Sequence, residues 1–117
     1  MAVIGQERTL LDAMFAINKA GAGAAFLVDS EGILAGLVTD GDIRRLISRD
    51  RSALDEPCGK LVTKKPLVVI NGDPLAVEAL QTLEEAPQKV GEAPVVDSEG
   101  RPVGLIMLKD LLRAGIV

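Results

Sequence analysis

The sequence predicts a mixed α/β fold, of the α+β kind, built from two tandem β-α-β-β-α units packed as a pseudo-twofold pair. The first observation is an internal repeat, because the segment VDSEG at residues 28–32 recurs at residues 96–100, a shift of 68 positions. The same shift aligns Asp42 with Asp110 and Arg45 with Arg113. A repeat of this kind indicates that one structural unit occurs twice.

The second observation is a helix near the start of each copy. In the first copy Thr9 is expected to cap the helix and Asp12 to complete a capping box. In the second copy Asp73 is expected to cap and Pro74 to take the first helical position. The apolar residues at helical spacing are Leu10, Met14 and Ile17 in the first copy and Val77, Leu80 and Leu83 in the second.

The third observation is a pair of β-rich runs, joined by a Ser-Glu-Gly turn, after each of these helices. This pattern is typical of a hairpin. Asp29 and Asp97 precede the two turns and are expected to form them, whereas residues 21–23 are expected to break the helix before the first strand. The expected strands are residues 25–29 and 33–39 in the first copy and residues 93–97 and 103–107 in the second.

A closing helix is predicted after each hairpin, and a linker between the copies. Residues 50–66 are largely polar and are expected to form the linker, and residues 67–70 form an apolar run expected to open the second copy as a strand. The repeats are therefore assigned to residues 1–56 and 57–117, and either half alone would have a marginal core. The apolar residues of the closing helices are Ile43, Leu46 and Ile47, and Leu111 and Leu112.

The composition excludes most catalytic chemistry. The 117 residues include no His, Trp or Tyr and a single cysteine, Cys58, so neither a Ser-His-Asp triad nor a Cys-His pair can form. No catalytic residue, metal ligand or required cofactor is assigned, and the chain is not expected to be an enzyme. Cys58 is expected to be a small buried residue, and one thiol without a partner favours a reducing compartment.

Charge and hydropathy exclude two classes of partner. The net charge of −4 and the lack of Tyr and Trp argue against nucleic-acid binding. No apolar run is long enough to span a membrane. We therefore expect a cytoplasmic protein with no nucleic-acid or membrane partner.

Several runs resemble the cystathionine-β-synthase (CBS) domain pair, also called the Bateman module. They are FLVD at 26–29, GLVTDGD at 36–42, LVTKKPLVV at 61–69, APVVD at 93–97 and GLI at 104–106. Within that family, residues 38–45 and 108–117 are most similar to the C-terminal pair of arabinose-5-phosphate isomerases, which carry their chemistry in an upstream sugar-isomerase (SIS) domain. The alternative is the pair found in sugar-nucleotidyltransferase-like proteins.

The resemblance implies a regulatory module that binds an adenosine nucleotide, AMP or ATP, or a nucleotide-sugar such as a CMP-sugar, in the cleft between the repeats. It also implies a homodimer formed through the helices. Thr39 and Asp42 would contact the ribose, because a carboxylate accepts hydrogen bonds from its hydroxyl groups. The implied ligand-binding residues are Thr39, Asp40, Asp42, Arg45, Lys64, Lys65, Pro66, Val69, Ala93, Pro94, Val95 and Asp110.

A structural interpretation of the same residues stays open. Thr39 followed three residues later by Asp42 is also an ordinary helix N-cap, which stabilises a helix by about 1 kcal/mol without a ligand. On this interpretation the chain is an oligomerisation module with no physiological ligand. The second copy has Met107 at the position of Thr39, and methionine cannot cap. We therefore expect unequal sites, with the better one at Thr39 and Asp42.

Overall fold

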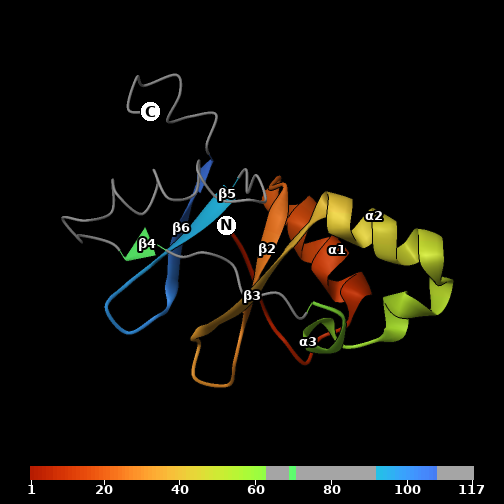
Figure 1. The fold of residues 1–117 in the computed structure, drawn as a ribbon, viewed down its shortest axis with the longest axis horizontal. Helices are drawn as coiled ribbons and strands as arrows, with labels where there is room; N and C mark the ends of the chain where they lie inside the picture. Colours follow the sequence, from red (N-terminus) through yellow and green to blue (C-terminus); the bar gives the residue numbers. More distant parts are fainter. Residues whose placement is uncertain (63–68, 71–91, 108–117) are drawn as a thin grey trace, which may run out of the picture. The chain divides into compact units, whose positions relative to one another are not determined.

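A computed structural model of the chain describes residues 1–62, 69–70 and 92–107 and divides into two compact units, Met1–Lys65 and Pro66–Val117 (Figure 1). The assignment of repeats to residues 1–56 and 57–117 stays a prediction beside this division. The first unit contains β1 (Ala2–Gly5), α1 (Leu10–Ala20), β2 (Ala24–Val28), β3 (Leu34–Thr39), α2 (Asp40–Arg49), the 3₁₀ helix η1 (Arg51–Asp55) and α3 (Cys58–Leu61). The described elements of the second unit are β4 (Val69–Ile70), β5 (Glu92–Val96) and β6 (Pro102–Met107).

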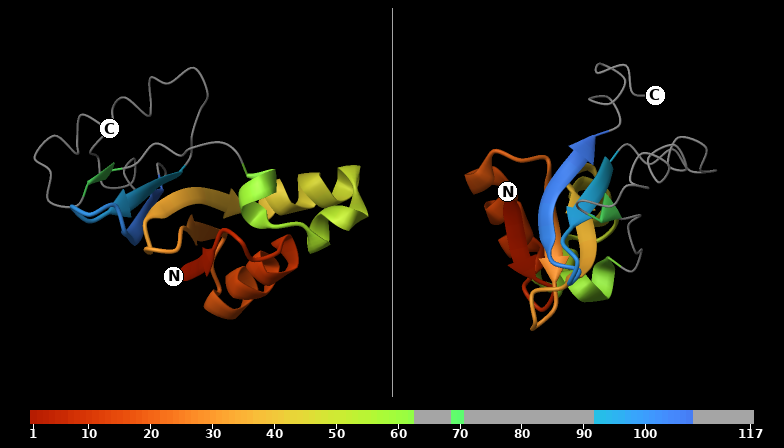
Figure 2. Two further views of the ribbon diagram at one scale, coloured as in Figure 1. Left: turned by 90° about the horizontal axis from the view of Figure 1, so that it is seen from below. Right: turned by 90° about the vertical axis from the view of Figure 1, so that its left-hand side faces the viewer.

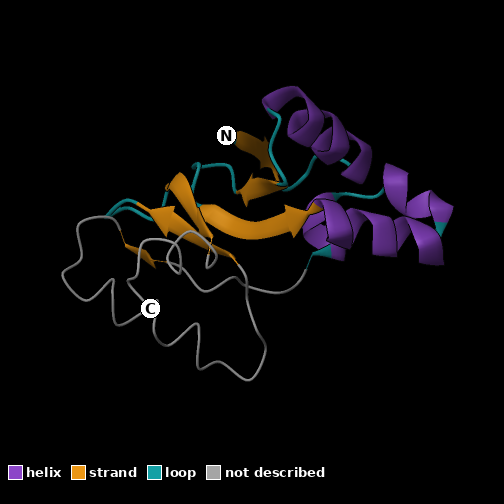
Figure 3. Ribbon diagram, turned by 90° about the horizontal axis from the view of Figure 1, so that it is seen from above, coloured by secondary structure: helices purple, strands orange, loops and turns teal. Residues whose placement is uncertain are grey.

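The predicted element order is confirmed in the first unit, and both predicted hairpins are present. Each unit has a three-stranded sheet whose first two strands run parallel and whose last two are antiparallel (Figure 3). The opening strand of the first unit is β1, which the sequence patterns had not located. The hairpin strands begin and end within one residue of the predicted limits. The second copy's helices, with Asp73, Pro74, Leu111 and Leu112, lie outside the described residues.

The two hairpins share their register, which confirms the repeat in three dimensions. Ala24 pairs with Thr39 in the first, and Glu92 pairs with Met107 in the second, 68 positions later in both strands. Each hairpin also has an irregularity in its register near the end of its first strand. Because register determines which face each side chain occupies, the two copies place equivalent residues on equivalent faces.

The turns of the hairpins are formed by the two predicted aspartates. Asp29 Oδ1 accepts hydrogen bonds from the backbone N–H groups of Glu31 and Ile33, at 2.9 and 3.1 Å. Asp97 Oδ1 does the same with Glu99 and Arg101, at 2.9 Å each. Such side-chain to backbone bonds stabilise a turn locally, so the prediction for both residues is confirmed.

Helix α1 begins and ends at the predicted residues, and its regularly spaced apolar residues are not equally buried. Thr9 caps the start, and Gly21 ends the helix with a φ of 63°, the left-handed conformation that favours glycine. The buried face consists of Leu10, Ala13 and Ile17, whereas Met14 is 36% exposed. Residue 14 lies at the edge of the buried stripe, and the small side chain of Ala13 takes the interior position.

Helices α1 and α2 lie beside the first sheet and share one core with it (Figure 2). Ile43 of α2 is buried there, and Leu46 and Ile47 pack against the core with partial exposure, as the helical spacing predicts. The buried core residues are Ala2, Leu10, Ala13, Ile17, Ala25, Leu27, Val38, Ile43, Ala53 and Cys58. This core positions the junction of β3 and α2, where the predicted ligand contacts begin.

The predicted linker is wrong over most of its length, because residues 50–62 belong to the first unit. Ala53 of η1 and Cys58 of α3 are both buried in its core. The backbone N–H of Leu10 donates to Glu56 O at 3.0 Å, and that of Cys58 donates to Arg8 O at 2.8 Å. These backbone bonds hold the segment against the start of α1.

The expectation that Cys58 is a buried structural residue is confirmed. Its side chain is fully buried, and its Sγ lies 3.3 Å from Thr9 O as a hydrogen-bond donor. Burial raises the pKa of the Cys58 thiol to about 11, with a smaller contribution from the negative charge of Asp12. The thiol is therefore neutral near pH 7, and a neutral thiol is a poor nucleophile.

Candidate functional site

The first group of predicted site residues lies where β3 passes into α2. Thr39 is the last residue of β3 and the N-cap of α2. Its Oγ1 accepts a hydrogen bond from the backbone N–H of Asp42 at 3.1 Å, and Asp42 Oδ2 accepts one from the backbone N–H of Thr39 at 3.0 Å. The predicted capping box is therefore present, and it holds the Asp42 carboxylate at the start of the helix.

Arg45 forms an ion pair with Asp42. Its Nη2 donates to Asp42 Oδ1 at 2.5 Å, and the two side chains are 65% and 39% exposed. Partial burial opposes ionisation of Asp42, but the hydrogen bonds from Thr39 and then from Arg45 outweigh it, so the pKa of Asp42 lies below its usual value. The carboxylate is therefore charged near pH 7, as an acceptor of hydroxyl donors should be.

The other predicted site residues fall into three groups. Asp40 is exposed at the first position of α2, and its backbone N–H donates to Gly23 O at 3.0 Å. Strand β5 of the second unit holds Ala93 and Pro94, both buried, and Val95, which is partly buried and pairs with Val69. The positions outside the described residues are Lys64, Lys65, Pro66 and Asp110. Within the first unit, the structure brings Thr39, Asp42 and Arg45 together.

A second capping box with the same construction stands at the start of α1. Thr9 Oγ1 accepts from Asp12 N at 3.2 Å, Asp12 Oδ2 accepts from Thr9 N at 3.2 Å, and Arg8 Nε lies 3.1 Å from the same Asp12 oxygen. The hydrogen bonds from Thr9 are the main cause of the lowered pKa of Asp12. A Thr-x-x-Asp pair with an arginine partner is thus built twice within one unit, which shows that the pattern by itself is a helix cap.

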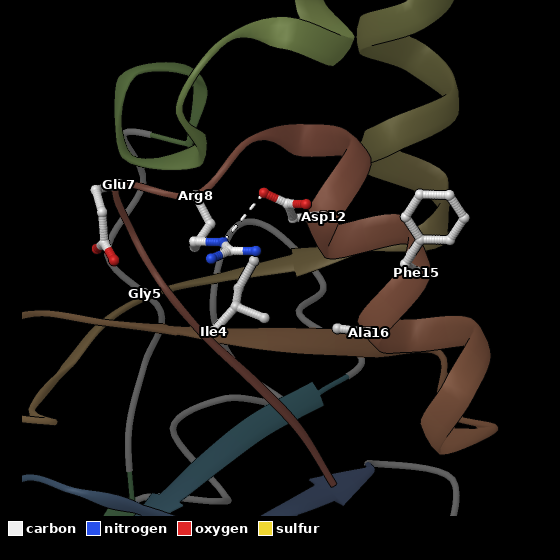
Figure 4. A pocket seen from close by; sticks show the side chains of 7 residues that line it. All are labelled: Ile4, Gly5, Glu7, Arg8, Asp12, Phe15 and Ala16. Atoms are coloured by element: carbon white, nitrogen blue, oxygen red, sulfur yellow. Dashed lines mark hydrogen bonds and ion pairs between the residues drawn. The ribbon is translucent and has the colours of Figure 1, made fainter.

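A hollow of about 480 Å³ lies beside this second capping box (Figure 4). The sequence patterns do not predict this hollow. The only sign of it in the sequence is the pair of charged residues, Arg8 and Asp12, at the start of the helix. The side chain of Phe15 lies at its margin and is 64% exposed. The hollow is lined by Ile4, Gly5, Glu7, Arg8, Asp12, Phe15 and Ala16.

The part of the chain that the structure describes contains neither a metal-binding cluster nor a membrane-spanning helix. Within residues 1–62, 69–70 and 92–107, no group of three His, Cys, Asp or Glu residues is placed to hold a metal ion. None of the helices that the structure describes has the length and apolar character needed to cross a membrane.

Comparison with known proteins identifies relatives by sequence. The CBS domain profile matches residues 1–49 and 58–116. Arabinose 5-phosphate isomerase KdsD of Pseudomonas aeruginosa is 36% identical over 93% of this chain and 32% of its own length. Arabinose 5-phosphate isomerase GutQ of Salmonella typhi is 31% identical over 93% of this chain and 33% of its own. The chain therefore spans about a third of the length of these relatives.

Solved structures of similar fold include proteins with a bound nucleotide. CBSX2 of Arabidopsis thaliana in complex with AMP is 26% identical, with a TM-score of 0.70 over 97% of this chain and 86% of that one. OpuCA of Staphylococcus aureus is 25% identical, with a TM-score of 0.73 over 97% and 90% of the two chains. PAE2072 of Pyrobaculum aerophilum, complexed with AMP, is 22% identical, with a TM-score of 0.77 over 94% and 82%.

Proposed function

We propose, from the premise that the chain belongs to the CBS domain family, that it is a regulatory module that binds an adenosine nucleotide or a nucleotide-sugar. The observation that carries the proposal is the charged, partly exposed carboxylate of Asp42, held at the start of α2 by Thr39. The AMP complex of CBSX2, a relative by fold at 26% identity, supports the choice of ligand class.

The proposed chemistry of the site follows from its donors and acceptors. The ribose hydroxyl groups donate to the Asp42 carboxylate, and hydrogen bonds to a charged acceptor are stronger than those between neutral groups. The proposal keeps the other predicted contacts: Asp40 and Arg45 in the first unit, Val69, Ala93, Pro94 and Val95 in the second, and Lys64, Lys65, Pro66 and Asp110 outside the described residues. Small apolar side chains would contact the base, since Tyr and Trp are absent from the chain.

The relatives suggest what the module regulates. The named relatives are arabinose 5-phosphate isomerases three times as long as the region matched. We therefore infer that the module belongs with a sugar-phosphate isomerase domain and carries no catalysis itself, rather than with a sugar-nucleotidyltransferase-like partner. A ligand can change the activity of such a partner only if it binds one arrangement of the protein more tightly than another.

Calorimetric titration of the 117-residue chain tests the ligand class. We expect heat of binding with AMP, ATP or a CMP-sugar, and saturation at a defined stoichiometry. If none of the three compounds gives heat of binding, the structural module without a ligand is favoured instead. That second candidate has a specific observation behind it, because the capping box of Thr9 and Asp12 has the same construction as the capping box of Thr39 and Asp42.

We also propose that the chain forms a homodimer through its helices. The outer face of α1 carries three apolar side chains, Leu11, Met14 and Phe15, at spacings of three and four residues, and Phe15 is the most exposed of them. We expect Phe15→Glu to shift sedimentation from dimer to monomer while the circular dichroism spectrum is unchanged. Ser30→Glu, at an exposed position outside α1, is the control, because it adds the same single negative charge. An unaltered dimer in Phe15→Glu would contradict this interface.

A further inference from the structure

The guanidinium of Arg45 lies folded back over the first turn of α2. Its Nη2 donates to Asp42 Oδ1 at 2.5 Å. A Cβ added at Gly41 would stand 3.3 Å from Nη1 and 3.7 Å from Nη2 of Arg45. The absence of a side chain at residue 41 therefore lets the guanidinium approach the helix start closely. The second copy has Lys109 at the position of Gly41.

Arg45 occupies the Asp42 oxygen that the capping box leaves available. Oδ2 accepts the backbone N–H of Thr39 at 3.0 Å, and Oδ1 accepts the guanidinium. A ribose that donates its hydroxyl groups to this carboxylate therefore competes with the guanidinium for the space beside Oδ1. Because the start of a helix repels positive charge, the pairing with Asp42 is the interaction that keeps the guanidinium in this place.

We propose that Arg45 makes the site selective for phosphorylated nucleosides over neutral nucleosides. A neutral nucleoside displaces the guanidinium from Asp42, and the guanidinium is then left without an anionic partner. A nucleoside phosphate displaces it too, but its phosphate then binds the released guanidinium, for which arginine is well suited. The inference rests on the proposed function. It adds that the site prefers phosphorylated ligands of that class and that the side chain of Arg45 sets this preference.

The expected effect is modest because the ion pair is exposed. Pairs of this kind stabilise a protein weakly, so removal of Arg45 should strengthen the binding of adenosine by about two- to fivefold. Loss of the contact between arginine and phosphate should weaken the binding of AMP by about three- to tenfold. The two changes have opposite signs, which a general loss of stability would not produce.

Titration of Arg45→Met with AMP and with adenosine tests this inference. Arg44→Met is the matched control, because Arg44 is the adjacent exposed residue of α2 and its replacement changes the net charge equally. We expect the preference for AMP over adenosine to fall by about tenfold in Arg45→Met and to stay at the wild-type value in Arg44→Met.

Three outcomes would overturn the inference. An unchanged preference in Arg45→Met, or an equal fall in both variants, would show that Arg45 does not set the selectivity, and the proposed function would survive. A wild-type chain that binds neither AMP, ATP nor a CMP-sugar would remove the proposed function and this inference with it. Circular dichroism of both variants checks that the exposed substitutions leave the fold intact.

Discussion

Replacement of Asp42 by alanine is expected to weaken AMP binding by about a hundredfold or more. The variant loses the charged acceptor of two ribose hydroxyl groups, and a hydrogen bond to a charged group contributes about 1.5 kcal/mol or more. The same change removes one half of the capping box, so the free energy of unfolding should fall by about 1 kcal/mol. Calorimetry measures the first effect, and urea unfolding followed by circular dichroism measures the second.

Asp12→Ala is the control that separates ligand binding from capping. Asp12 has the same geometry at the start of α1, with Thr9 as its cap partner and Arg8 as its ion-pair partner. Its loss should destabilise a helix start in the same way, and AMP binding should be unchanged. If both variants bind AMP as tightly as the wild type, Asp42 is a capping residue alone. If both lose binding equally, the effect is a general one on the fold.

Replacement of Leu10 by alanine is expected to lower the free energy of unfolding by about 3 to 4 kcal/mol, the largest change in stability that we predict for a single residue. Leu10 is fully buried at the first position of α1, among the core residues of the first unit. Its removal leaves a cavity bounded by the sheet and the segment that follows α2. The chain has no Trp or Tyr, so circular dichroism is the appropriate signal for urea unfolding.

The adjacent Leu11→Ala is the matched control, with the same chemical change in the same helix. Leu11 is 37% exposed, so the loss should be less than about 1 kcal/mol. Both variants are to be compared at a concentration at which the chain sediments as a monomer, because Leu11 belongs to the proposed dimer face. Equal losses from the two leucines would contradict the burial of Leu10.

Local interactions explain why much of the fold is predictable from the sequence. The capping boxes at Thr9 and Thr39 join residues three positions apart, and the turns at Asp29 and Asp97 join residues two and four positions apart. Interactions of such short range depend on residue type and spacing, which a sequence displays directly. The repeat then extended each of these local predictions to a second copy.

The errors concern residues whose surroundings come from distant parts of the chain. The interval 50–62 has few large apolar side chains, and its small buried residues, Ala53 and Cys58, give no clear period. Its place in the core depends on backbone hydrogen bonds to Arg8 and Leu10, more than forty positions away in the sequence. Helical spacing also does not show how wide the buried stripe will be, so it does not separate the exposed Met14 from the buried Leu10 and Ile17.

The candidate site likewise has features that follow from short-range sequence patterns and features that depend on the folded structure. The repeat, the hairpins, the helix starts and the pair of Thr39 and Asp42 can be predicted from the sequence, because each depends on spacings of a few residues or on a recurring motif. Only the three-dimensional packing shows that residues 50–62 complete the first core and that Arg45 lies over Gly41 with its guanidinium on Asp42. An exposed arginine has many rotamers of similar energy, and only the positions of the surrounding atoms select one.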